Sequence, residues 1–282
     1  MIQLLQKGQT SLAKVELEDL KHDPSPVEEA LWIDLLFPSR EEEEFVEKHM
    51  DVEIRTKEEM HEIEVSSRLF VEDSALYMSC WLLSYESPIP ENTSVTFILN
   101  ARQLASIRYS DHHAFRIFTM ERKTRLSKRF NSTNDVLVEV MDAVVGQNAS
   151  TLRQIEQSLN TLSLEIFSDQ SGAAKAMRRS GLKTVVQRLG KRNSLVSSLR
   201  ESSMSVQNLA MFVISNADGW IQPKHVERIR LLEHDVRSLR DYDAQLSSEI
   251  NFLLDSTVGL IGFQQNQSMK ILSVAALLLA LI

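Results

Sequence analysis

Up to about residue 110, the chain alternates short apolar runs with polar stretches, as mixed α/β domains do. The runs are rich in β-branched and aromatic residues, and they predict strands at 30–37, 68–72, 76–85, 94–99 and 103–109. After the first run, Ser39 and the acidic residues that follow it predict a helix N-terminus, because serine caps free backbone N–H groups and carboxylates favour the positive end of the helix dipole. We therefore expect one sheet covered by helices.

After His112 the strand pattern disappears and helical periodicity replaces it. A coiled-coil seam with alternating spacings of three and four residues is formed by Leu152, Ile155, Leu159, Leu162 and Ile166. This seam predicts one long helix over 134–168, which a second helix over 173–215 follows after a break at Ser171-Gly172. Pro223 then suits the first turn of a third helix.

The third helix has the most regular apolar spacing of the three. Its apolar positions are Leu232, Val236, Leu239, Leu246, Ile250, Leu253 and Leu260, with Asp243 and Thr257 as polar interruptions. If it continues from 224 to 282, it has 59 residues and a length of about 88 Å at 1.5 Å per residue. A helix of that length must leave its globular domain, and we expect its polar positions to pack against other copies around a wet axis.

The last twelve residues, 271–282, are apolar except for Ser273. Twelve residues are fewer than the roughly 20 that a membrane-crossing helix needs, yet the segment has no terminating glycine, proline or basic flank. We expect the sequence to stop inside a transmembrane helix whose cytoplasmic edge is marked by Lys270.

Composition narrows the class of protein further. The 282 residues include only 8 glycines, which suits long unbroken elements, and the net charge of −8 argues against a nucleic-acid-binding protein. The single cysteine, Cys80, excludes an internal disulfide and is expected to be buried in a strand. No secretory signal, phosphate-binding loop or nucleophile motif occurs, so we expect a cytoplasmic N-terminal domain and no enzyme activity.

Several polar clusters have a structural interpretation beside a functional one. Asp111-His112-His113 contains potential metal ligands but is more typical of a turn or cap. Glutamates 41–44 favour a solvated first turn of a helix over a ligand cluster. His225 and His234 are expected on an exposed helix face. A basic run without acidic residues either contacts anionic lipid headgroups or nucleic acid, or forms a solvated helix-hairpin tip. Its members are Lys175, Arg178, Arg179, Lys183, Arg188, Lys191, Arg192 and Arg200.

The segment before the apolar tail gives the sharpest functional signal. Asp255 and Asn266 are eleven residues apart, about three helical turns, and therefore share a face. We expect Met269 and Leu272, three and six residues after Asn266, to continue this face. Around a pore, rings of carboxylate and amide oxygens would hold a hydrated cation, with Asp255 as a possible metal contact, and the apolar rings would gate it by dewetting. An ordinary juxtamembrane stalk is the alternative.

The sequence resembles the CorA family of divalent-cation channels over essentially its whole length. The likeness is carried by Trp32-Ile33-Asp34-Leu35 with Pro38, by 63–68, and by Phe115-Arg116 with Met120. It is strongest over 250–254 and 266–274, which are similar to the junction between stalk and membrane in bacterial members.

The resemblance implies an α+β protein, with a sandwich-like cytoplasmic α/β domain at 1–130 and a hairpin of long antiparallel helices at 131–222. A stalk helix would occupy 223–268, and an incomplete first transmembrane helix 269–282. It further implies a homopentamer in the inner membrane that conducts Mg²⁺, and often Co²⁺ or Ni²⁺, under control of intracellular Mg²⁺. Asp255 and Asn266 match pore-lining polar rings, and Met269 and Leu272 match a hydrophobic gate.

The sequence also departs from the family pattern. It contains neither the Gly-Met-Asn signature nor a second apolar span, and its hairpin tip, including Lys175, Arg178, Arg179 and Lys183, is basic where acidic tips are common. A position that binds regulatory Mg²⁺ in relatives corresponds to Leu231, so no regulatory site is carried over. A zinc transporter of the ZntB type and a tail-anchored coiled-coil scaffold remain alternatives.

Overall fold

The computed structural model describes residues 1–56, 59, 68–72, 74–87, 90–119, 129–167, 178–216 and 219–280. The chain forms two compact units. The first, called unit 1, comprises Met1–Ser150 and Ser198–Arg240, and the second, called unit 2, comprises Thr151–Ser197 and Asp241–Ile282.

Unit 1 contains a seven-stranded mixed sheet with the strand order β2-β1-β3-β7-β6-β5-β4. Only β3 and β7 pair in parallel, and all other neighbours are antiparallel. The strands are β1 (Ile2–Gln6), β2 (Ala13–Val15), β3 (Ala30–Leu36), β4 (Leu69–Glu72), β5 (Ala75–Ser84), β6 (Glu91–Asn100) and β7 (Leu104–Arg108). The five strands predicted from the sequence are therefore confirmed, with ends shifted by at most three residues.

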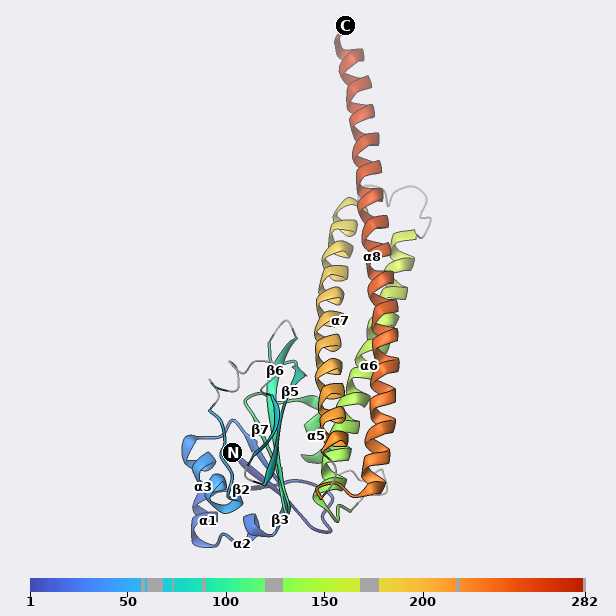
Figure 1. Cartoon of the computed structure of the whole chain (residues 1–282). Coiled ribbons are helices and arrows are strands. Elements are labelled where there is room, and N and C mark those ends of the chain that lie inside the picture. The colour runs from blue at the N-terminus through green and yellow to red at the C-terminus, as the bar shows by residue number, and fades with distance from the viewer. Residues whose placement is uncertain are drawn as a thin grey trace. The chain divides into compact units, whose positions relative to one another are not determined.

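Helices cover both faces of this sheet (Figure 1). Side chains alternate along each strand, so that Trp32 joins one apolar core and the next residue, Ile33, joins the other. The second core lies under α1 (Leu17–His22), α2 (Ser25–Glu28) and α3 (Arg40–Met50). The first lies under α5 (His113–Thr119) and the unit 1 parts of α6 (Thr133–Phe167), α7 (Arg178–Ser215) and α8 (Pro223–Ala280).

The predicted N-terminus of α3 is confirmed in detail. Ser39 accepts a hydrogen bond from the backbone N–H of Glu42, and the Glu42 carboxylate accepts one from the N–H of Ser39, which completes a capping box. The expectation that glutamates 41–44 form a solvated first turn is wrong for Glu43. This residue is buried and accepts a hydrogen bond from the Tyr109 hydroxyl.

The three long helices are confirmed, but the expectation that Asp243 and Thr257 pack against other copies is wrong. In unit 2, the coiled-coil seam of α6 from Leu152 to Ile166 is buried, and so are Leu246, Ile250 and Leu253 of α8. Asp243 and Thr257 are buried on the same side of α8, and Thr257 donates its hydroxyl hydrogen to the Leu253 carbonyl. These polar positions therefore lie inside the single chain and not between copies.

The α+β class is confirmed, whereas the division into segments at 130, 222 and 268 stays a prediction. The compact units divide the long helices instead, since α6, α7 and α8 each contribute to both units. Sequence patterns missed the short elements β1, β2, α1, α2 and α5.

Candidate functional site

Four residues were predicted to line a pore: Asp255, Asn266, Met269 and Leu272. All four lie on α8 within unit 2, and all four side chains are exposed. Eleven residues of α-helix turn through about 1,100°, so Asp255 and Asn266 lie within about 20° of each other around the helix axis. Two oxygen-bearing side chains therefore point to the same side, about 16 Å apart along the helix.

The hydrophobic pair does not continue this line. At about 100° per residue, Met269 lies about 60° and Leu272 about 120° around the helix from Asn266. Both side chains are about two-thirds exposed, at 67% and 68%. The two residues are three positions apart and about 60° from each other around α8, so both can face one axis, and their role as a gate stays a prediction.

The C-terminal part of α8 has no buried residue from Val258 to Ala280. Its exposed large apolar side chains include Val258, Phe263, Met269, Ile271, Leu272, Val274, Leu277, Leu278 and Leu279. Among the described residues, no helix is both long enough and apolar enough to cross a bilayer. So large an apolar surface calls for a cover from outside the chain, because soluble monomers seldom expose contiguous apolar patches of this size.

Two glycines interrupt the same exposed segment. A Cβ atom added at Gly259 or Gly262 would meet nothing within 4 Å, so packing within the chain does not require glycine at either position. A glycine inside a helix lowers the stability of that helix by about 1 kcal/mol relative to alanine. Packing among the described residues does not account for this cost at Gly259 or Gly262.

The basic run is only partly described, and part of it is already paired. Arg188 forms an ion pair of 2.8 Å with Glu165, and Arg192 donates to the Ser158 hydroxyl. Lys183 is exposed on α7. Lys175 and the side chains of Arg178 and Arg179 lie outside the described residues, so a lipid-binding or solvated tip stays a prediction.

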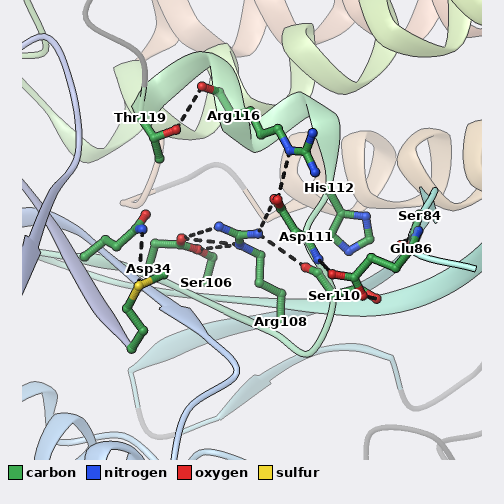
Figure 2. Close-up of polar contacts among 12 residues, drawn as sticks. Asp34, Ser84, Glu86, Ser106, Arg108, Ser110, Asp111, His112, Arg116 and Thr119 are labelled. Atoms are coloured by element: carbon green, nitrogen blue, oxygen red, sulfur yellow. Dashed lines mark hydrogen bonds and ion pairs between the residues drawn. The ribbon is translucent and has the colours of Figure 1, made fainter.

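A buried ion pair joins β3 to β7 (Figure 2). The guanidinium of Arg108 contacts both carboxylate oxygens of Asp34, with the shortest distance 2.7 Å, and the two side chains are 2% and 0% exposed. Ser106 donates a hydrogen bond of 2.6 Å to Asp34 and accepts one from the indole N–H of Trp32. The Trp32-Ile33-Asp34-Leu35 motif thus supplies two members of a core network.

The same arginine connects the sheet to the segment before α5. Arg108 donates to the Ser110 carbonyl and lies 4.5 Å above the Phe115 ring. Asp111 accepts hydrogen bonds from both Arg108 and Arg116, as Figure 2 shows. These contacts fix the Asp111-His112 turn, so the structural interpretation of this cluster is confirmed.

His112 is a buried, neutral side chain. Its Nδ1 lies 3.2 Å from the Leu83 carbonyl and its Nε2 lies 3.3 Å from the Thr93 hydroxyl, which suits a neutral ring that donates at Nδ1. Burial, aided by the nearby charge of Arg108, lowers the pKa of His112 to about 4. Burial likewise raises the pKa of the Cys80 thiol to about 12, so this cysteine is an inert core residue, as predicted.

The expectation that His225 is exposed is wrong. The residue is 5% exposed, and its Nε2 lies 2.8 Å from a carboxylate oxygen of Asp135 near the start of α6. Although burial opposes ionisation of Asp135, hydrogen bonds from His225, Ser132 and Asn131 outweigh it and lower the pKa of Asp135. The pair holds the first turns of α6 and α8 together within unit 1. His234 is exposed, as expected.

No group of three or more His, Cys, Asp or Glu side chains in the described ranges is placed to hold a metal ion. In the part of the chain that is described, candidate ion contacts therefore come from single residues such as Asp255.

Comparison with known proteins points to one family. A family model described as CorA-like Mg²⁺ transporter protein matches residues 27–281. A magnesium transport protein CorA of Mannheimia succiniciproducens is 25% identical over 255 residues, which cover 90% of this chain and 78% of the relative.

Two solved structures show the fold. The complete CorA magnesium transporter of Methanocaldococcus jannaschii matches with a TM-score of 0.71 at 14% identity, over 98% of this chain and 82% of that one. The cytoplasmic domain of ZntB from Vibrio parahaemolyticus matches with a TM-score of 0.52, also at 14% identity, over 84% of this chain and 88% of that one.

Proposed function

The chain belongs to the family of CorA-like Mg²⁺ transporter proteins, and on this premise we propose that it forms the cytoplasmic and stalk portion of a homopentameric channel. The channel would mediate passive Mg²⁺ uptake, with Co²⁺ and Ni²⁺ as further cargo. It would lie in the inner membrane, with unit 1 in the cytoplasm, and intracellular Mg²⁺ would regulate its opening. Transport, and not enzymatic catalysis, is the activity of this family.

One observation carries the proposal: the exposed C-terminal part of α8 combines an oxygen-bearing face with an apolar surface that none of the described residues covers. In a pentamer, five copies of α8 around one axis would cover part of that surface. They would also bring five Asp255 and five Asn266 side chains into rings. A bilayer would cover the remaining apolar side chains toward Ala280.

The chemistry of these rings suits a hydrated Mg²⁺ ion. Mg²⁺ gives up its water shell reluctantly, so carboxylate and amide oxygens that accept hydrogen bonds from its water ligands can bind it without dehydration. Because the ion is the cargo, such contacts must be weak enough to release it. A chain of net charge −8 gives a pentamer of about −40, which would concentrate divalent cations near the entrance.

Met269 and Leu272 would form the closed gate beyond these rings. Both side chains are exposed in the single chain, so five copies can place them against one another across the axis. A narrow apolar constriction closes by losing its water. The two residues are three positions apart, about 60° around α8, so both can face the same axis, one turn after the other.

A zinc transporter of the ZntB type is the second candidate. Its support is the structural likeness to the ZntB cytoplasmic domain, whose TM-score of 0.52 is lower than the 0.71 of the CorA structure. A tail-anchored scaffold without transport is the third, and family membership weighs against it.

Ion flux distinguishes the three candidates. The natural protein that carries this chain is placed in liposomes with a negative interior, and entry of Mg²⁺ or Zn²⁺ is followed with ion-sensitive dyes. We expect Mg²⁺ entry that increases with the membrane potential and exceeds Zn²⁺ entry. Preferential Zn²⁺ entry would support the ZntB-type candidate, and absence of either flux would support the scaffold.

A further inference from the structure

An open cleft of about 400 Å³ lies on unit 1 beside the connection from α7 to α8. The start of β3, the turn between β6 and β7, and the start of α6 complete its walls. Sites for small molecules usually measure about 300–1,000 Å³, so the cleft is large enough for one. All of its lining residues belong to unit 1, whereas the proposed ion pathway lies on α8 in unit 2.

One buried side chain holds the wall of this cleft in place. Asn134, 5% exposed near the start of α6, donates a hydrogen bond of 3.1 Å to the Trp220 carbonyl. Its side-chain oxygen accepts a hydrogen bond of 3.0 Å from the Gln222 N–H. Both bonds join α6 to the connection before α8, so the cleft exists in the free chain and needs no ligand to form it.

Arg102 supplies a positive charge to the cleft. The residue is exposed on the turn between β6 and β7, and its side chain lines the cleft. Among the described residues, no acidic side chain lines the cleft, and the guanidinium of Arg102 has no ion pair or hydrogen bond. By contrast, Arg188 pairs with Glu165, and Arg228 pairs with Glu139. An unpaired guanidinium favours an anion from solution, and its planar fork suits phosphate oxygens.

Two uncharged side chains of the cleft also have hydrogen-bonding groups to spare. Within the described ranges, the Thr133 hydroxyl and the Gln222 side-chain amide have no hydrogen-bond partner. The neighbouring Ser132 hydroxyl, in contrast, donates to the carboxylate of Asp135, which does not line the cleft. A hydroxyl and an amide N–H can each donate to a phosphate oxygen, so the α6 wall and the connection before α8 each offer a donor.

Trp220 gives the same cleft an aromatic surface. Its side chain is partly buried and packs against the first apolar core, and it also lines the cleft together with Leu31 and Ile221. Aromatic side chains bind the planar bases of nucleotides by stacking, and positively charged side chains bind their phosphates. A lone inorganic anion would leave the apolar wall unused, and an uncharged aromatic ligand would leave Arg102 unpaired.

We propose that this cleft, which we call the Trp220 cleft, binds a nucleoside phosphate. The base would stack on Trp220, and the phosphate oxygens would accept hydrogen bonds from Arg102, Thr133 and Gln222. Bound in this way, the ligand would link the turn after β6 to the starts of α6 and α8, and its binding would stabilise unit 1. The inference concerns unit 1 alone and does not rest on ion transport by the chain.

Isothermal titration calorimetry of the natural protein in detergent tests this site with ADP as the probe. The buffer is free of Mg²⁺, so that ADP cannot act by chelating it. We expect one saturable site per chain, with binding about fivefold or more tighter for ADP than for pyrophosphate, which lacks the base. The thermal midpoint should rise with the concentration of ADP. No saturable binding at millimolar ADP, or equal affinity for the two ligands, would overturn the proposal.

The variant Arg102→Gln tests the phosphate contact. Loss of hydrogen bonds to a charged ligand should weaken ADP binding about tenfold or more. Lys183→Gln is the matched control, because it removes the same charge from an exposed position on α7 in unit 2. Equal loss in the two variants would indicate unspecific charge attraction and contradict the site. Wild-type affinity in Arg102→Gln would contradict it as well.

The variant Trp220→Leu separates stacking from folding. Without the indole, the affinity for ADP should fall to that for pyrophosphate, while unchanged pyrophosphate binding shows that the cleft is still formed. If both affinities fall together, or if neither changes, Trp220 does not stack on a base and the nucleotide assignment is wrong. Mg²⁺ flux enters none of these measurements, so a negative result would leave the proposed function standing.

Discussion

Replacing Arg108 with methionine removes the positive charge from a core site without leaving a large cavity. Among the described residues, Asp34 would then keep only the Ser106 hydroxyl as a hydrogen-bond donor, and its side chain is fully buried. Removing one partner from a buried ion pair costs about 3–5 kcal/mol, because the remaining charge is uncompensated.

Proton uptake sets a limit to this loss. An aspartic acid side chain ordinarily titrates about three pH units below neutrality, so burying it protonated at pH 7 costs about 4 kcal/mol at 1.36 kcal/mol per unit. We therefore expect Arg108→Met to lower the free energy of unfolding of unit 1 by about 3–4 kcal/mol at pH 7. The deficit should shrink as the pH falls toward 5, because protonation then costs less.

Urea unfolding followed by tryptophan fluorescence measures this loss, since Trp32, Trp81 and Trp220 all lie in unit 1. The double variant Asp34→Asn with Arg108→Met should recover most of the stability, because neither charge is then buried. A single-variant loss below about 1 kcal/mol, or a double variant as unstable as the single one, would refute the reasoning.

Two further predictions concern a buried histidine and the gate. The His112 ring titrates near pH 4 when folded and near 6.5 when unfolded, so stability should fall by up to about 3 kcal/mol as the pH drops from 6.5 to 4. His112→Gln should flatten this dependence in urea titrations, and an unchanged pH profile would remove His112 as its source. Met269→Ala with Leu272→Ala should widen the dewetted constriction and raise the resting Mg²⁺ leak into liposomes several-fold. A closed state as tight as that of the wild type would argue against the gate.

The sequence predicted the long helices well because their signal is repeated many times. The seam from Leu152 to Ile166 provides five apolar positions in one register, and all five are buried. The helix N-terminus at Ser39 was equally predictable, since the serine and the acidic residues that mark it lie within a few positions of each other. Local patterns of this kind need no tertiary information.

The errors arise where burial depends on residues that are distant in sequence. His225 looked exposed because its own helix turn is charged, yet Asp135, ninety residues earlier, covers it. Asp34 and Arg108 are 74 residues apart, and no local sequence pattern predicts that they pair. The buried Asp243 and Thr257 show the same limit, because a polar residue in an apolar seam does not reveal which neighbour it faces.

The position of Asp255 on an ion pathway is tested most directly by Mg²⁺ flux through the natural protein with Asp255→Ala. Glu249→Ala is the matched control, because Glu249 lies six residues earlier and about 120° around α8. We predict that Asp255→Ala changes the Mg²⁺ flux or its dependence on intracellular Mg²⁺ several-fold, whereas Glu249→Ala changes neither. Unchanged flux and unchanged Mg²⁺ sensitivity in Asp255→Ala would contradict the assignment of this face of α8 to the pore.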